Sequence, residues 1–209
     1  MMNKKTRRII GGVTAVLVTL SMVGAGMIGY FIGDDVPPTP TSASSDYADF
    51  YQNQKSQVEY LQQQVAANPD DIELKQNLGK AYFNLALIAM QTVPAEVTED
   101  FNQAIKNYQD VLQTKKDINV LTDLAVAAYY GGQSELAEQT FKEALALQPD
   151  FELALIYYGM FLSEVKQDNT GAIGMWQKAL DKNPTGPNAD FLKQYIAQAE
   201  SMQNQKTEP

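Results

Sequence analysis

Residues 137–149 read AEQTFKEALALQP, and residues 172–184 read AIGMWQKALDKNP. In both stretches an alanine is followed by a large aromatic residue, then by a second alanine, and finally by a proline at the same spacing. The same steps connect Ala104, Tyr108 and Lys116, with lysine in the place of proline. A unit that recurs in this way is typical of solenoids, in which each unit buries its apolar face against its neighbours.

A second pattern precedes each of these stretches, with a small residue in its second position. It runs as Leu78-Gly79-x2-Tyr82, Leu124-Ala125-x2-Ala128 and Tyr158-Gly159-x2-Leu162. Together the two patterns resemble those of the tetratricopeptide repeat (TPR) family, over residues 70–184. The resemblance implies an all-α helix-hairpin solenoid of about three repeats, with a leading helix before it and a capping helix after it.

The first repeat departs from the family spacing. From Gly79 to Ala104 there are 25 residues, whereas from Ala125 to Ala137 there are 12. We therefore expect the first helix of this repeat to extend to about Met90, with a loop around residues 92–95.

The N-terminal segments predict a single membrane span. Residues 1–8 form a basic leader, and the 25 residues 9–33 contain no charge. At about 1.5 Å per residue, a helix of this length exceeds the ~30 Å hydrocarbon core. The positive-inside rule then keeps the N-terminus cytoplasmic and the rest of the chain extracytoplasmic. Cleavage as a signal peptide, at Thr41-Ser42-Ala43-Ser44, is the alternative.

The remaining boundaries follow from composition and helical periodicity. The order is a Pro/Ser-rich linker over 34–45, a leading helix over 46–69, the TPR domain over 70–203 with its capping helix at 189–203, and a disordered tail over 204–209. Asn68-Pro69-Asp70 marks the start of a new helix, because proline favours a first helical position.

Small residues recur at every fourth position in the membrane segment. They are Ser21, Ala25, Gly29 and Gly33. Such a ridge lets two helix backbones approach and pair, which predicts a homodimer through the membrane helix. The alternative interpretation is that glycine is simply common in membrane helices.

Composition argues against an enzyme. The chain has no His and no Cys, and arginine occurs only at positions 7 and 8. Common general bases, thiolate ligands and bidentate phosphate clamps are therefore missing, and we expect no cofactor and no metal. The net charge of −9 disfavours nucleic acid as a partner. Carboxylates at the predicted helix starts, such as Asp71 and Glu96, are expected to interact with helix dipoles.

The resemblance also implies a concave surface that binds peptides through the first helix of each hairpin. The repeat register assigns ten residues to this groove: Lys80, Phe83, Asn84, Val126, Tyr129, Tyr130, Leu153, Ile156, Tyr157 and Met160. The Lys/Asn/Arg clamp of co-chaperone members is absent, since two of its positions hold Asp123 and Leu153. The groove is instead apolar and rich in tyrosine, which suits peptide recognition. The alternative is that some of these side chains pack against neighbouring helices.

These features predict a bacterial, membrane-anchored TPR scaffold that binds a partner protein or peptide outside the cytoplasm. Two other functions remain open. One is an assembly factor for exported proteins, similar to the membrane-anchored TPR subunits of cytochrome c maturation. The other is a structural subunit of a larger membrane complex.

Overall fold

The computed structural model describes residues 45–207, apart from the side chains of residues 45–48, 91–92 and 205–207. By its internal contacts the chain divides into Met1–Tyr47 and Ala48–Pro209, and the packed helices belong to the second unit. The described residues form eight helices and no strand: α2 (Ser45–Ala67), α3 (Ile72–Thr92), α4 (Val97–Thr114), α5 (Ile118–Tyr130), α6 (Ser134–Leu147), α7 (Glu152–Glu164), α8 (Asn169–Lys182) and α9 (Ala189–Thr207).

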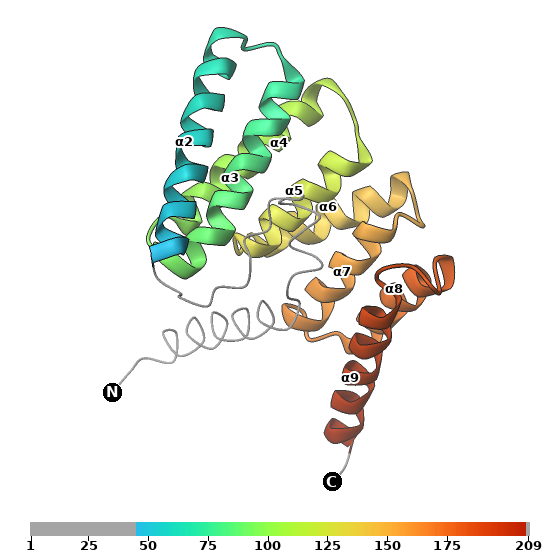
Figure 1. The fold of residues 1–209 in the computed structure, drawn as a ribbon. Helices are drawn as coiled ribbons and strands as arrows, with labels where there is room; N and C mark the ends of the chain where they lie inside the picture. Colours follow the sequence, from blue (N-terminus) through green and yellow to red (C-terminus); the bar gives the residue numbers. More distant parts are fainter. Residues whose placement is uncertain (1–44, 208–209) are drawn as a thin grey trace. The chain divides into compact units, whose positions relative to one another are not determined.

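Successive helices pack against one another as hairpins (Figure 1). The pairs α3–α4, α5–α6 and α7–α8 make the most extensive contacts, and α9 covers α8. The hairpins join through α4–α5 and α6–α7, and the first helices are neighbours through α3–α5 and α5–α7. This part of the chain is thus an all-α solenoid of three hairpins with a helix before and after them, as the repeated pattern predicts.

The small and aromatic residues of the repeat meet where the pattern places them. Trp176 is 1% exposed, and its indole Nε1 donates a hydrogen bond to the Ile156 carbonyl oxygen at 3.1 Å. A Cβ added to Gly159 would lie 2.6 Å from Trp176 Cδ1, and one added to Gly79 would lie 2.9 Å from Tyr108 Cε1. Only glycine therefore lets the two helices of these hairpins approach so closely.

Aspartate side chains fix the starts of three helices. Asp71 accepts hydrogen bonds from the backbone N–H groups of Glu73 and Leu74, both at 3.0 Å. Asp117 caps α5 and Asp168 caps α8 in the same way. Because these caps satisfy donors that the helix cannot, they set the first residue of each helix. The predicted start of α3 at Pro69 is wrong for this reason, since the cap at Asp71 begins the helix at Ile72.

Two helices run slightly beyond their expected ends. Helix α3 continues to Thr92, two residues past the expected Met90. Helix α9 continues to Thr207 and so includes residues 204–207, which were predicted to belong to a disordered tail. Gln203 Nε2 donates to Thr170 Oγ1 at 2.9 Å, and no glycine or proline interrupts this stretch. The contact with α8 and the absence of a helix breaker account for the extra turn.

Helix α2 joins the first hairpin through polar contacts. The Tyr51 hydroxyl donates to Glu96 Oε2, and Lys55 Nζ pairs with the same oxygen at 3.1 Å. Gln62 Nε2 donates to the Tyr82 hydroxyl on α3. Tyr51 and Val58 of α2 are buried.

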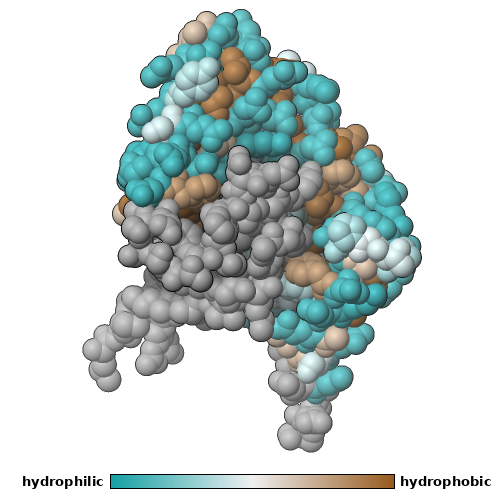
Figure 2. Space-filling model, viewed as in Figure 1, coloured by the Kyte–Doolittle hydropathy of each residue, from teal (hydrophilic) through white to brown (hydrophobic). Residues whose placement is uncertain are grey.

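No helix within residues 45–207 combines the length and apolar character needed to cross a bilayer. The predicted leader 1–8, membrane helix 9–33 with its small-residue ridge, and linker 34–44 lie outside the described residues. In the space-filling view most of the coloured surface is hydrophilic, with apolar residues gathered in a few patches (Figure 2). The most exposed large apolar side chains, Tyr60, Leu147, Val165 and Met202, belong to separate elements of the solenoid.

Candidate functional site

The ten predicted groove residues come from the first helix of each hairpin. Helix α3 carries Lys80, Phe83 and Asn84. Helix α5 carries Val126, Tyr129 and Tyr130, and helix α7 carries Leu153, Ile156, Tyr157 and Met160. Because α5 contacts both α3 and α7, the fold brings the three sets together, as the register requires.

The ten side chains differ in exposure. Six are buried: Phe83, Val126, Tyr129, Ile156, Tyr157 and Met160. Asn84, Tyr130 and Leu153 are partly exposed, and Lys80 is exposed. These last four side chains reach the surface, whereas the six others are packed beneath it.

Aromatic rings connect the three hairpins in an unbroken chain. The Tyr130 ring lies 6.3 Å from the ring of Phe83 and stacks on Tyr129 with centroids 4.7 Å apart. Tyr129 in turn meets Phe161 of α7 edge to face at 5.9 Å. Pairs with these geometries stabilise by about 0.5–1.5 kcal/mol beyond the area that they bury. The tyrosines of α5 therefore hold the three hairpins together.

Two carboxyl groups on these first helices have raised pKa values. Asp123 of α5 is 5% exposed, and burial raises the pKa of its carboxyl to about 7, while the charge of Lys80 opposes this shift. Glu164, the last residue of α7, accepts a hydrogen bond from the Tyr129 hydroxyl. Burial raises the pKa of Glu164 as well. Asp123, which occupies one position of the absent clamp, lies among buried side chains.

A second aromatic cluster lies where α9 covers α8. The Tyr195 ring of α9 lies 5.2 Å from the Trp176 ring and 4.3 Å from the Phe191 ring. The charge of Glu164 contributes to raising the pKa of Tyr195 to about 12, after the larger effect of burial. The repeat register does not assign Tyr195 to the groove. Its one signal in the sequence is its position in the predicted capping helix, which follows the last repeat.

Two of the acidic residues at helix starts make hydrogen bonds that stabilise the fold. Asp71 caps α3, and Glu96 holds Tyr51 and Lys55 of α2. Burial raises the pKa of Asp100 to about 6, with the charge of Glu96 as a second cause. Within the described residues, no group of three or more acidic side chains is arranged to hold a metal ion.

Comparisons with solved structures identify the fold. A crystal structure of MamA protein aligns with a TM-score of 0.57 and 17% identity, over 77% of this chain and 82% of that one. A crystal structure of a tetratricopeptide repeat protein from Parabacteroides merdae aligns with a TM-score of 0.51 and 19% identity, over 75% of this chain and 58% of that one. The described part of the chain therefore has the tetratricopeptide repeat fold, which confirms the resemblance drawn from the repeated pattern.

Two curated proteins resemble this chain in sequence, at 26–27% identity. An uncharacterized protein, ycf37, from Pyropia yezoensis is 27% identical over 60% of this chain, and the match spans 65% of that protein's length. The formate-dependent nitrite reductase complex subunit NrfG of Escherichia coli O157:H7 is 26% identical over 73% of this chain and 72% of its own length. No protein-family model matches the sequence.

Proposed function

We propose that this protein is a membrane-anchored TPR scaffold that binds a partner protein or peptide outside the cytoplasm, on the face formed by α3, α5 and α7. The observation that carries the proposal is the convergence of Lys80, Asn84, Tyr130 and Leu153 from three consecutive first helices over an apolar, aromatic layer. Apolar and tyrosine side chains supply contact area at low entropic cost. Binding of this kind should depend weakly on salt, because few exposed ion pairs contribute.

Membrane anchoring rests on the sequence of the first 33 residues. An uncharged run of 25 residues after four basic residues fits a single span with the N-terminus inside. Pairing through Ser21, Ala25, Gly29 and Gly33 would make the scaffold a dimer.

A second candidate function is that of a subunit in a larger membrane complex. The similarity to NrfG favours it, because the name of that protein describes a subunit of a formate-dependent nitrite reductase complex. An assembly factor that holds exported chains transiently is the third candidate. The lifetime of the complex separates these two functions. A subunit stays with its partner in mild detergent, whereas an assembly factor releases it.

The binding face is tested with single cysteines, which the chain permits because it has none of its own. Leu153→Cys places a photoreactive maleimide on the proposed face, and Leu147→Cys places the same reagent on α6, where Leu147 is 51% exposed. On illumination of cells, we expect position 153 to cross-link a discrete partner that position 147 does not. Cross-linking of the same partner from position 147 alone would move the binding surface to the second helices.

The orientation is tested with the same Leu147→Cys variant. A maleimide that cannot cross membranes should label it in intact cells stripped of any wall, because residues 34–209 are expected outside. The apparent mass of the labelled protein then distinguishes an anchored chain from one cleaved near Ser44. Labelling only after lysis would reverse the orientation.

A further inference from the structure

Helix α2 rests on the first hairpin through few buried side chains (Figure 1). Among its described side chains, those of residues 49–67, only Tyr51 and Val58 are buried. Tyr51 and Lys55 donate hydrogen bonds to the same carboxylate, that of Glu96 on α4. An element with few buried apolar contacts opens at a lower free energy than the core beside it. Helix α2 is therefore suited to detaching while the hairpins stay folded.

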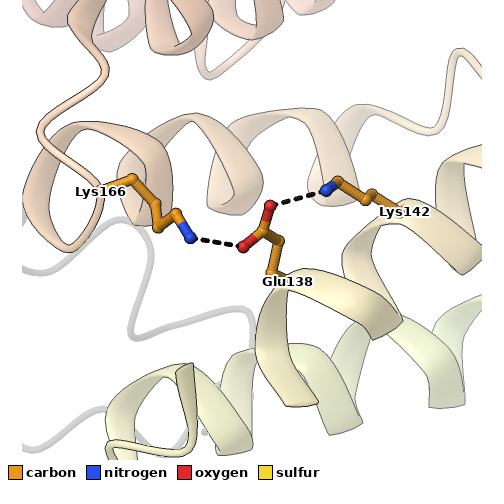
Figure 3. Close-up of polar contacts among 3 residues, drawn as sticks. All are labelled: Glu138, Lys142 and Lys166. Carbon is orange, nitrogen blue, oxygen red and sulfur yellow. Dashed lines mark hydrogen bonds and ion pairs between the residues drawn. The ribbon is translucent and has the colours of Figure 1, made fainter. Parts of the chain in front are cut away.

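Asp100 lies on the same face of α4 as Glu96, one turn further along. Residues four apart are neighbours on a helix surface, so this carboxyl lies next to the place where α2 contacts α4. The residue is 6% exposed, and its Oδ2 is buried without a hydrogen-bond partner. Glu138 of α6 is the opposite case, because its two oxygens pair with Lys142 Nζ at 2.6 Å and Lys166 Nζ at 2.7 Å (Figure 3). Asp100 Oδ2 has lost water and has gained no such partner.

The titratable groups that act on Asp100, or that feel its charge, come from α4, α2 and α3: Glu96, Glu99, Lys55, Tyr51 and Tyr82. Burial is the main cause that raises the pKa of Asp100 to about 6, the charge of Glu96 is the second, and Lys55 opposes the shift. Burial raises the pKa of both tyrosines, so they stay uncharged at neutral pH. On α5, which also packs on α4, Asp123 is affected by Lys80 and not by Asp100. The buried acid of the pair on α4 is therefore tolerated best in its protonated form.

We propose that Asp100 makes the docking of α2 on the first hairpin sensitive to pH. While the carboxyl carries a proton, α2 covers it at little electrostatic cost, and the contacts of Tyr51 and Lys55 with Glu96 hold the helix. Once Asp100 is ionised, the docked helix keeps an unpartnered charge away from water and beside a second carboxylate. Detachment of α2 lets water reach that charge, so a rise in pH shifts the helix from docked to detached.

Glu96 has the opposite effect and limits docking at low pH. Its pKa is lowered, first by the hydrogen bond from Tyr51 and then by that from Lys55, so it stabilises docking only while it is ionised. This contribution is lost as pH falls below its ordinary pKa of 4.5, whereas that of Asp100 is lost as pH rises from 3.8 towards 6. Docking should therefore be tightest at about pH 4.5 and weaken on both sides.

The helix that responds to pH is the one next to the predicted membrane anchor in the sequence. Helix α2 has 23 residues and so spans about 35 Å. Its detachment lengthens the connection between the anchor and the hairpins by up to that amount. This consequence rests on the proposed function, whereas the docking of α2 does not need an anchor.

Detachment is measured by the reaction of single cysteines with dithiodipyridine, in the full chain reconstituted in lipid nanodiscs. Val58→Cys places a thiol on the buried face of α2, and Gln57→Cys places one on its exposed face. The ratio of the two rates at each pH gives the protection that docking provides, because the pH dependence of thiolate formation cancels. Val120→Cys, at a buried position of α5, reports opening of the hairpins instead.

Between pH 5 and pH 7.5 the protection of the cysteine at position 58 should fall severalfold, up to about 10-fold, since each unit of pKa difference is a tenfold change in the equilibrium. Asp100→Asn should abolish this fall, because the amide does not titrate. Glu99→Gln removes an exposed acid of the same turn and should retain the fall. Tyr51→Phe should lower the protection at both pH values and leave its pH dependence unchanged, because only a contact with Glu96 is lost.

Two kinds of result would overturn the pH-sensitive docking. One is a protection at position 58 that does not change with pH in the wild type. The other is a pH dependence that survives Asp100→Asn, or that the cysteine at position 120 shares in full, because the whole domain would then be losing stability. A chain that does not insert into nanodiscs would contradict the proposed anchor alone, and docking is then measured on the same chain in detergent.

Discussion

Replacing Trp176 with alanine should lower the free energy of unfolding by about 3–5 kcal/mol. The indole is 1% exposed, donates to the Ile156 carbonyl, and packs against Tyr195 of α9. Its removal opens a cavity between the last hairpin and the capping helix and also removes the side-chain hydrogen bond to the Ile156 carbonyl oxygen. Thermal and urea melts of the fragment 46–209 measure the loss. Leu147→Ala, at an exposed position, should change stability by less than about 0.5 kcal/mol.

A double-mutant cycle identifies the contact that is responsible. Gly159→Ala should destabilise the wild type, because the new Cβ would meet the Trp176 ring at 2.6 Å. In the Trp176→Ala background the same change should be neutral or stabilising, since alanine favours helix over glycine by roughly 1 kcal/mol. Additive effects of the two changes would show that the helices do not touch through these residues.

The second large effect concerns pH and Asp123. Burial raises the pKa of this carboxyl in the folded protein from 3.8 to about 7, whereas the unfolded chain keeps the ordinary value. Between these two values the folded state holds a proton that the unfolded state has lost, so stability falls as pH rises. Because one unit of pKa corresponds to about 1.4 kcal/mol, the loss between pH 4 and pH 8 should be roughly 2–4 kcal/mol.

Asp123→Asn should remove most of this dependence. The variant should match the wild type at pH 4, where the carboxyl is protonated, and exceed it at pH 8. Asp100 and Glu164, whose pKa values are also raised, leave a smaller decline of the same sign. Melting temperatures across this range provide the measurement, with the exposed Asp181→Asn as control. A pH profile that Asp123→Asn does not alter would mean that the carboxylate is solvated.

The repeated pattern predicted the helix contacts well, because those contacts follow from the spacing itself. Gly159 and Trp176 occupy fixed positions in the repeat, so their meeting is visible in the sequence. The start of α3 was predicted at Pro69 because proline generally favours the first position of a helix. In the structure the side chain of Asp71 caps the helix, and only its hydrogen bonds show that α3 begins at Ile72. Helix boundaries depend on such local competition.

The candidate site was predicted less completely than the fold. Register places Asp123 and Tyr129 on the first helices but does not state their burial, which depends on how the helices tilt and what packs across them. Tyr195 escaped notice because it comes from a helix outside the repeated pattern. Its contact with Trp176 arises only when α9 packs on α8. Contacts between distant parts of the chain carry no signal in the spacing.

The pairing of each helix with the next one has a consequence for how the domain acquires its structure. Nearly all extensive contacts join elements that are adjacent along the chain, from α3–α4 to α8–α9. A topology of this kind has a low contact order, so little loop-closure entropy opposes its formation and folding is fast. Each hairpin can nucleate as soon as its own residues are free, and the next can condense onto it. The chain can therefore fold progressively from its N-terminal end as it is synthesised, without waiting for its last helix.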